Sequence, residues 1–309
     1  MLCTNCTPTS DYDIEEPEEQ VSDKLSKMAN IGRHVFEDGS LYEGDLVRGL
    51  PDGFGIIKFV SGDFYEGQFR RGVTNGHGTM RYKSDPQFEK YSGNWENGKR
   101  SGFGTLTLSD QSTMQGHWNN DTLVYGEFKS STGVVSYGKW MNGVLEDGTV
   151  IYPEGERFSG RLNSEGNYEY GTLILPTGEV YFGDFLEGDY HGSGVLMDSS
   201  GNIYTGKFDS GQKSGIGILK DFDGSSYSGE FAKGLPHGQG RQSDLSGVTY
   251  HGSWKDGVKD GDGVLDFGDG TTYTGQFENG LAVDGIYDWG DGTKTRSFQN
   301  ENGDWQDFE

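Results

Sequence analysis

Hydrophobic and polar residues alternate along most of the chain in short runs that glycine-rich turns separate. In residues 203–208, Tyr204, Gly206 and Phe208 fall on one face of an extended strand, because side chains alternate between faces. Ser210-Gly211 then supplies a turn, and a second alternating run follows it. A strand, a tight turn and a returning strand predict a β-hairpin.

This hairpin returns about every 23 residues, and in most copies it opens with Tyr-x-Gly-x-(Phe/Trp/Leu). A fixed period predicts a repeat architecture, in which each unit contacts its neighbours. We therefore expect an all-β fold, an elongated and thin antiparallel sheet of tandem hairpins. The motif residues of the most regular copies are Tyr42, Gly44, Tyr65, Gly67, Tyr91, Gly93, Tyr181, Gly183, Tyr204, Gly206, Tyr227, Gly229, Tyr250, Gly252, Tyr273 and Gly275.

The motif glycine predicts a packing role. Glycine weakens a strand unless another group must approach its backbone closely. It lies between two aromatic positions on one face, so we expect the ring of an adjacent strand to lie flat over the bare backbone. Most return strands carry a Gly-x-Gly pair, such as Gly215 and Gly217, which we expect to provide the matching space.

Copies four to six are irregular. Met114 and Ser136 replace the motif tyrosine, Asp121 replaces a turn glycine, and the return strands have lost one glycine. We expect this stretch to bend or twist differently, or to meet a partner. Restoring the consensus there should then stabilise the array and weaken partner binding. An insertion at residues 84–90 is predicted to protrude as a loop.

These residues resemble the MORN (membrane occupation and recognition nexus) repeats, whose consensus is roughly Tyr-x-Gly-x-(Phe/Trp)-x-x-Gly-x-x-His-Gly-x-Gly-x-(aliphatic). The copy at residues 181–195 follows this pattern closely, and so does the copy at residues 227–240, with His237 in the histidine position. The resemblance covers about residues 36–298. It implies a twisted single-layer antiparallel sheet, often curved into a trough lined with aromatic residues, and homodimerisation through terminal repeats.

Three segments follow from these patterns: residues 1–30 as an acidic, partly disordered tail, residues 31–298 as an array of about 11–12 repeats, and residues 299–309 as a C-terminal cap or tail. Within the tail, a narrow apolar stripe predicts a short helix over residues 17–29 that covers the first exposed strand. The alternative is an unstructured tail with incidental apolar residues.

The two cysteines, Cys3 and Cys6, lie in the tail. A Cys-x-x-Cys pair is only half of a structural zinc site, and no second pair exists. Cysteines at an extreme N-terminus are also candidates for S-acylation, and two acyl chains anchor a protein stably. The alternative is a pair of exposed thiols.

Composition narrows the function classes. The formal net charge of −24 repels nucleic acid and disfavours direct binding to anionic membranes. The chain contains neither an apolar run long enough for a membrane helix nor a secretory signal pattern, so we expect a cytoplasmic protein. The resemblance adds the cytoskeleton or the cilium and flagellum as locations, with a peripheral membrane site as the alternative.

Candidate chemistry is sparse. Asp260, Asp262, Asp266 and Asp269 could supply oxygens to Ca²⁺, but Asp-Gly is also ordinary turn chemistry and recurs elsewhere, at Asp38, Asp223 and Asp291. None of the six histidines has a recurring Ser, Cys or Asp at triad spacing. We therefore expect no catalytic residue, metal or cofactor.

The resemblance and this sparse chemistry predict a non-enzymatic scaffold that binds protein partners along an extended sheet. A peripheral membrane module, binding phospholipid directly or through S-acylation, is the alternative. Some similar arrays precede a kinase or methyltransferase domain, but the residues outside this array are too few for either.

Overall fold

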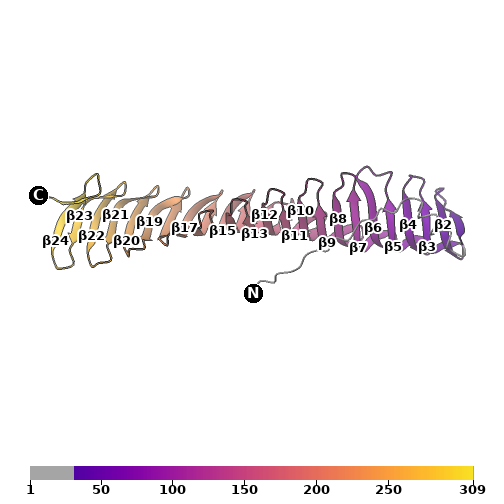
Figure 1. Cartoon of the computed structure of the whole chain (residues 1–309), viewed down its shortest axis with the longest axis horizontal. Helices are drawn as coiled ribbons and strands as arrows, with labels where there is room; N and C mark the ends of the chain where they lie inside the picture. Colours follow the sequence, from indigo (N-terminus) through magenta and orange to yellow (C-terminus); the bar gives the residue numbers. More distant parts are fainter. Residues whose placement is uncertain (1–30, 309) are drawn as a thin grey trace. The chain divides into compact units, whose positions relative to one another are not determined.

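The computed structural model describes residues 31–308, and every regular element among them is a β-strand. The contacts between residues are grouped into two compact units, residues 31–123 and residues 124–308, and we describe each unit by itself. In each unit, strands that follow one another in the chain pair side by side in antiparallel fashion (Figure 1). The prediction of an all-β antiparallel sheet built from hairpins is confirmed, while the predicted helix at residues 17–29 lies outside the described residues.

The first unit is one layer of strands, each paired with the next from β1 to β8. They are β1 (Gly32–Val35), β2 (Leu41–Val47), β3 (Leu50–Lys58), β4 (Phe64–Arg70), β5 (Val73–Arg81), β6 (Phe88–Glu96), β7 (Lys99–Leu108) and β8 (Thr113–Asn119).

The second unit continues in the same way from β9, whose first two residues precede the boundary, to the short strand β25. Its strands are β9 (Thr122–Lys129), β10 (Val135–Met141), β11 (Val144–Ile151), β12 (Arg157–Leu162), β13 (Tyr168–Ile174), β14 (Val180–Leu186), β15 (Asp189–Met197), β16 (Ile203–Asp209), β17 (Gln212–Lys220), β18 (Ser226–Ala232), β19 (Leu235–Ser243), β20 (Thr249–Lys255), β21 (Val258–Asp266), β22 (Thr272–Glu278), β23 (Leu281–Asp288), β24 (Lys294–Gln299) and β25 (Trp305–Asp307).

Tight turns close the hairpins where the sequence places them. Between β16 and β17, Ser210 and Gly211 have φ angles of 48° and 77°, the left-handed pair that a two-residue hairpin turn requires. Asn120 and Asp121 adopt the same conformation with φ angles of 47° and 69°. The loss of the turn glycine at Asp121 therefore leaves the turn intact, since Asn and Asp tolerate this region.

The insertion at residues 84–90 forms less of a loop than predicted. Its last three residues continue strand β6, so the loop prediction is wrong for residues 88–90. The remaining loop is tied back to the sheet, because the backbone N–H groups of Lys83 and Ser84 donate to one carboxylate oxygen of Asp63 at 2.7 and 2.9 Å. Burial alone would raise the pKa of Asp63, but these hydrogen bonds hold it at about 2.

Candidate functional site

In each unit, a row of glycines crosses the strands. In the second unit, Gly206 of β16 lies opposite Gly194 of β15 on one side and Gly217 of β17 on the other. This glycine row contains Gly32, Gly44, Gly55, Gly67, Gly78, Gly93, Gly104 and Gly116 in the first unit, and Gly126, Gly138, Gly148, Gly160, Gly171, Gly183, Gly194, Gly206, Gly217, Gly229, Gly240, Gly252, Gly263, Gly275 and Gly285 in the second.

In the regular copies, a tyrosine ring fills the space that a pair of glycines leaves. A Cβ atom on Gly217 would lie 2.5 Å from Cε2 of Tyr204, and one on Gly206 would lie 2.6 Å from Cζ of the same ring. The ring over the motif glycine Gly206 therefore comes from its own strand, two residues earlier, and the prediction of a ring from an adjacent strand is wrong for that glycine. The ring over the return-strand glycine Gly217 does come from the adjacent strand. Along a strand, side chains two apart share a face, so this ring reaches its own glycine and the neighbouring one together.

Only the second glycine of each Gly-x-Gly pair provides the matching space. The first, such as Gly215 with a φ of 57°, lies in a bulge where the pairing skips two residues between Gly217 and Ser214. That glycine is needed for its left-handed backbone rather than for ring packing.

The bulge also explains why the motif uses tyrosine instead of phenylalanine. The hydroxyl of Tyr204 donates to the backbone carbonyl of Lys207 at 2.9 Å, at the point where the pairing register shifts. All eight predicted motif tyrosines donate in this way to the carbonyl three residues on, over 2.8–3.4 Å. Burial raises the pKa of the Tyr227 and Tyr250 hydroxyls to about 12, which keeps them protonated as donors.

Edge-to-face ring contacts join neighbouring repeats across this face. Tyr204 contacts Phe208 of its own repeat and Phe231 of the next, with ring centroids 5.1 and 4.9 Å apart. Comparable contacts follow one another as a continuous series of rings, which runs from Tyr42 to Trp118 in the first unit and from Phe158 to Trp305 in the second. We call this the aromatic face; its rings are buried against one another and against the glycine row.

The irregular copies interrupt the aromatic face. The three atoms nearest to the Cβ positions of Gly138 and of Gly148 are all backbone atoms, where Ser136 replaces the motif tyrosine, whereas ring atoms are among the nearest in the regular copies. The pairing of β10 with β11 also shifts at a different residue, between Lys139 and Trp140. This stretch is thus packed differently, as its sequence predicts; whether it meets a partner stays a prediction.

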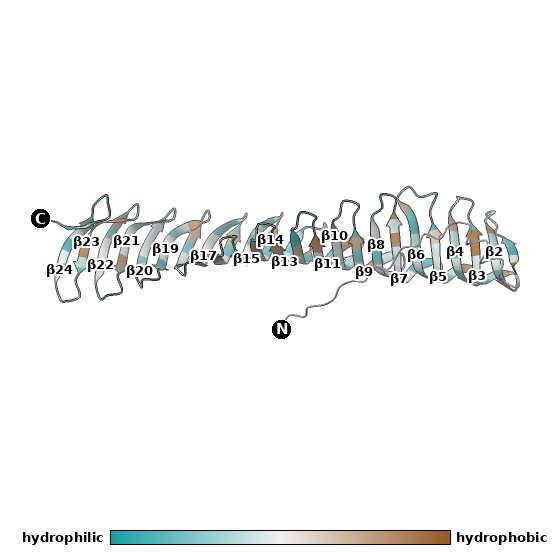
Figure 2. Cartoon of the chain, viewed as in Figure 1, coloured by the Kyte–Doolittle hydropathy of each residue, from teal (hydrophilic) through white to brown (hydrophobic). Residues whose placement is uncertain are grey.

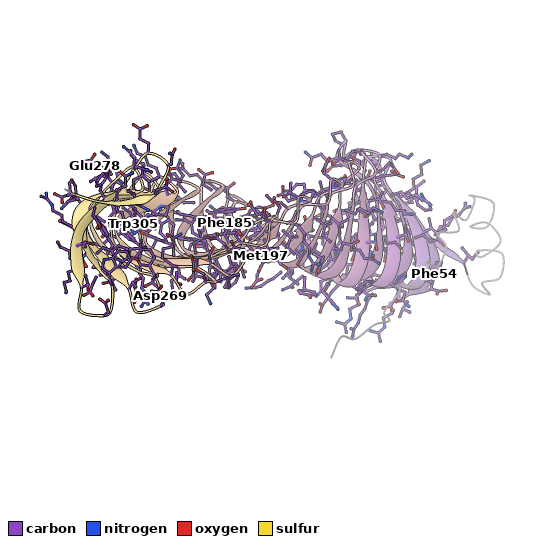
Figure 3. The ribbon with its side chains drawn as sticks, turned by 60° about the vertical axis from the view of Figure 1, so that its left-hand side comes forward. Phe54, Phe185, Met197, Asp269, Glu278 and Trp305 are labelled. Atoms are coloured by element: carbon purple, nitrogen blue, oxygen red, sulfur yellow. The ribbon has the colours of Figure 1, made fainter. Side chains whose placement is uncertain are left out.

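The side chains on the opposite face of each unit are largely exposed, and we call this face the open face. Figure 3 draws the side chains and labels Phe185 of the aromatic face and Met197 of the open face. Figure 2 shows hydrophobic and hydrophilic residues interspersed along the strands. Over β13–β17 it carries an apolar strip, whose side chains are 37–44 % exposed: Ile174, Phe182, Val195, Met197, Ile203 and Ile218. These residues are neighbours through the pairs Phe182 with Val195 and Met197 with Ile203, and they come from different repeats.

Basic residues border the apolar strip. Arg157 and Arg161 lie on β12, opposite Ile174 and Tyr170 of β13. On the other border are Lys207 of β16 and Lys220 of β17, which lies opposite Ile203. All four basic side chains belong to exposed residues in a chain of net charge −24.

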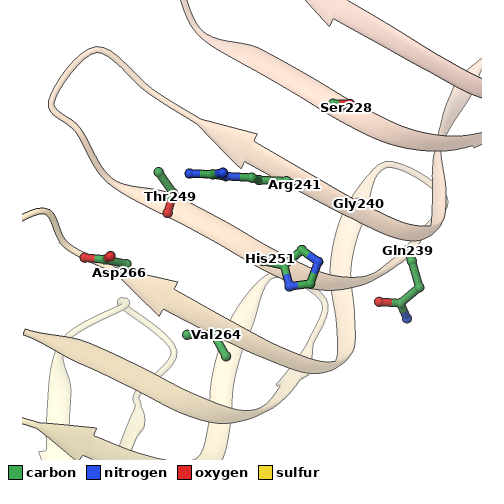
Figure 4. Close-up of a pocket in the computed structure, with 8 residues that line it drawn as sticks. All are labelled: Ser228, Gln239, Gly240, Arg241, Thr249, His251, Val264 and Asp266. Carbon is green, nitrogen blue, oxygen red and sulfur yellow. The ribbon is translucent and has the colours of Figure 1, made fainter.

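Further along the open face, β18–β21 line an open hollow of about 680 Å³ (Figure 4). Its lining includes Ser228, Arg241, His251 and Asp266, with Val264 beside them. The resemblance implied a trough lined with aromatic residues; this hollow is polar, and the aromatic rings of the same strands lie on the other face.

Within residues 31–308, no three His, Cys, Asp or Glu side chains lie close enough together to hold a metal ion. Asp266 and Asp269 each accept the N–H of the residue two positions on, at 2.9 Å. Asp262 accepts a hydrogen bond from Gln276 instead. Asp269 therefore caps a turn, as the alternative interpretation of the Asp-Gly dipeptides predicts, and Asp223 makes the same contact.

The consensus histidines recur in one arrangement. Nδ1 of His191 lies 3.8 Å from Oδ1 of Asp209, and Nδ1 of His237 lies 3.8 Å from Oδ1 of Asp256. Each pair joins a return strand to the end of the next repeat's first strand. No Ser or Cys hydroxyl or thiol is hydrogen-bonded to either histidine among the described contacts, so these pairs have the form of inter-repeat links.

The MORN repeat family model matches residues 42–64, 65–85, 91–113, 181–203, 204–226, 227–247, 250–272 and 273–294. These ranges leave out copies four to six. No curated protein matches the chain. No helix among residues 31–308 is long and apolar enough to cross a membrane.

Similar solved structures include the SAS-4 (dCPAP) TCP domain of Drosophila melanogaster, in complex with a proline-rich motif of Ana2. It is 13% identical with a TM-score of 0.32, over 59% of this chain and 94% of that one. The microcephaly protein CPAP G-box domain is 11% identical with a TM-score of 0.16, over 91% and 99%. Virginiamycin B lyase from Staphylococcus aureus is 12% identical with a TM-score of 0.14, over 83% and 90%.

Proposed function

The chain belongs to the MORN repeat family, and from that premise we propose that it is a non-enzymatic scaffold whose open face binds protein partners. One observation carries the proposal. The recurring tyrosines and glycines are consumed in packing and in backbone hydrogen bonds on the aromatic face, so the recognition groups left to solvent are those of the open face. Repeat arrays commonly bind through such an extended surface.

We further propose that the protein acts in the cytoplasm, at the cytoskeleton or in a cilium or flagellum, and that terminal repeats pair two copies. These finer proposals rest on family analogy alone. Proximity labelling in the native cell, combined with localisation, tests them: enrichment of cytoskeletal or ciliary proteins is the expected result. Labelling dominated by membrane lipid enzymes would contradict the scaffold proposal.

Direct membrane binding is the competing function. Flotation of the purified chain with phosphatidylcholine vesicles, with and without phosphoinositides, separates the two functions. We expect no flotation with either, because the net charge of −24 opposes an anionic surface. Salt-sensitive flotation with phosphoinositides would overturn this expectation. Metabolic labelling with an alkyne fatty acid, compared between the native chain and a Cys3→Ser/Cys6→Ser variant, tests S-acylation.

Absence of catalysis is part of the proposal. It is supported by the roles of the reactive groups: Asp223 and Asp269 accept turn N–H groups, and the motif tyrosines donate to backbone carbonyls. Incubation of the pure protein with labelled ATP and phosphoinositides should transfer no phosphate to lipid. Transfer above that of a heat-denatured control would refute it.

A further inference from the structure

The apolar strip on β13–β17 has the composition of a docking surface. Six exposed aliphatic, methionine and phenylalanine side chains lie together on the open face, within the second unit. Scattered single apolar residues on a surface need no explanation, whereas a contiguous patch with a polar border marks an interaction site. The glycine row and the aromatic face do not require these residues, because strand alternation points them to the other side.

The border of the strip indicates the charge of the partner. Arg157 and Arg161 lie on one side and Lys207 and Lys220 on the other. Arg161 also lies 3.8 Å from Glu169. Asp184, a carboxylate on the open face of β14, accepts the N–H of Ser193 at 3.1 Å. Basic groups around an apolar centre complement a ligand with an apolar centre and carboxylates beside it.

The backbone of the strip indicates the shape of the partner. Strands β13–β17 are each paired on both sides, so they have no free edge to which an extended peptide could add. An extended peptide lying on the face would leave its own N–H and C=O groups unpaired against apolar side chains. A helix satisfies these groups internally and presents an apolar stripe.

We propose that the apolar strip binds an amphipathic helix of a partner protein, with the helix's apolar stripe on Phe182, Val195 and Ile218 and its acidic flanks beside the four basic residues. Five strands at a spacing of about 4.8 Å span about 19 Å, which corresponds to a helix of about 13 residues. This inference rests on the proposed scaffold function and names its site and partner class.

Two other occupants fit less well. In the first alternative, a second copy of the chain places its own apolar strip face to face with this one, about a two-fold axis that lies between the two faces. With either orientation of that axis, a basic border then lies over a basic border. A flat anionic membrane would meet carboxylates at both ends of the same strands, including Glu187, Asp209 and Asp223, which are all exposed. A narrow helix lying across the strands avoids these turns.

The test measures binding of a fluorescent synthetic helix of about 18 residues to the full chain. The probe carries leucine at positions i, i+3, i+4 and i+7 with glutamate on both flanks; a reordered peptide of the same composition and a peptide with lysine in place of glutamate are its controls. The chain variant, which we call the strip variant, is Val195→Thr/Ile218→Thr; the two residues are 37 and 44 % exposed. Its matched control is Val264→Thr/Ile286→Thr, at 39 and 44 % on the same face outside the strip.

We expect the chain to bind the acidic helix and neither of the two control peptides. The strip variant should weaken the affinity for the acidic helix at least about tenfold, and its matched control less than about twofold. Arg161→Gln/Lys207→Gln should weaken binding and reduce its dependence on salt. Equal binding of the reordered peptide, or equal effects of both variants, would overturn the proposal. Two further results would also overturn it: a dimer in light scattering, or flotation with phosphatidylserine vesicles, if the strip variant abolishes that dimer or flotation and its control does not.

Thermal melting of each variant tests whether it is folded. Proximity labelling in the cell with the strip variant distinguishes the two proposals: loss of particular protein partners supports the strip as their site. An unchanged set of protein partners refutes the strip and leaves the scaffold function standing.

Discussion

The substitution Gly217→Ala isolates the contact between ring and glycine. The added Cβ would lie 2.5 Å from Cε2 and 2.7 Å from Cζ of Tyr204, closer than real Cβ atoms approach other atoms. The backbone of Gly217 is not left-handed, so steric overlap with the ring is the source of the cost. Overpacking a closely packed site costs about 1–3 kcal/mol. Alanine regains up to about 1 kcal/mol by restricting the unfolded chain, so a net destabilisation of about 1–2 kcal/mol is expected.

Two measurements check this value. Thermal unfolding should shift down by about 2–4 °C per kcal/mol, and hydrogen exchange should accelerate most in β16 and β17, because repeats contact only their neighbours. The control is a double-mutant cycle with Tyr204→Leu, which removes the ring's outer atoms. Gly217→Ala should cost at least about 1 kcal/mol less in that background. An equal cost in both backgrounds would refute the contact as the reason for the glycine.

The remaining predictions concern the hydroxyl, the tyrosine titration and the irregular copies. Tyr204→Phe should cost about 1–2 kcal/mol in urea unfolding, because the carbonyl of Lys207 loses its donor; a cost below about 0.3 kcal/mol would show that water replaces it. Burial places the pKa of Tyr227 at about 12 in the folded chain against about 10 unfolded, so its contribution to stability is full below pH ~10 and is lost as pH rises toward ~12. Absorbance titration should show the motif tyrosines ionising only together with unfolding. Ser136→Tyr restores a ring above Gly138 and should raise the unfolding temperature; loss of a bound partner at unchanged fold would locate a site there, and unchanged binding would count against it.

The strands and their buried face follow directly from the sequence. Tyr204, Gly206 and Phe208 occupy alternate positions, and alternation fixes which side chains share a face whatever the neighbouring strand does. The tight turns follow as well, since Ser210-Gly211 and Asn120-Asp121 both accept left-handed backbone.

The origin of the covering ring could not be predicted, because it depends on pairing register. Counting outward from the turn at residues 210–211 pairs Lys207 with Ser214, and regular pairing would place Gly206 opposite Gly215. The bulge instead brings Gly206 opposite Gly217, which is the contact that the Tyr204 ring covers. A bulge of two residues leaves the alternation unchanged, so the sequence pattern contains no sign of it.

The apolar strip was missed for a related reason. Phe182, Val195 and Ile218 occupy positions that the repeat motif leaves unspecified, and they belong to three different hairpins. Each alone is an ordinary exposed apolar residue in a β-strand. Only the pairings across β14, β15, β16 and β17 make them neighbours.

This arrangement separates the residues that hold the array together from those that can recognise a partner. Every motif residue of the copies at Tyr181 and Tyr204 points to the aromatic face or into a turn, while the apolar strip lies on the other face of the same regular copies. A partner site therefore does not require a broken motif, because open-face side chains contribute little to packing and can change without loss of the glycine row. Substitutions at Val195 and Ile218 should accordingly change binding with little effect on stability, whereas Gly217→Ala should do the reverse. If the strip substitutions instead destabilised the sheet as much as Gly217→Ala does, the two faces would share one packing role and this separation would fail.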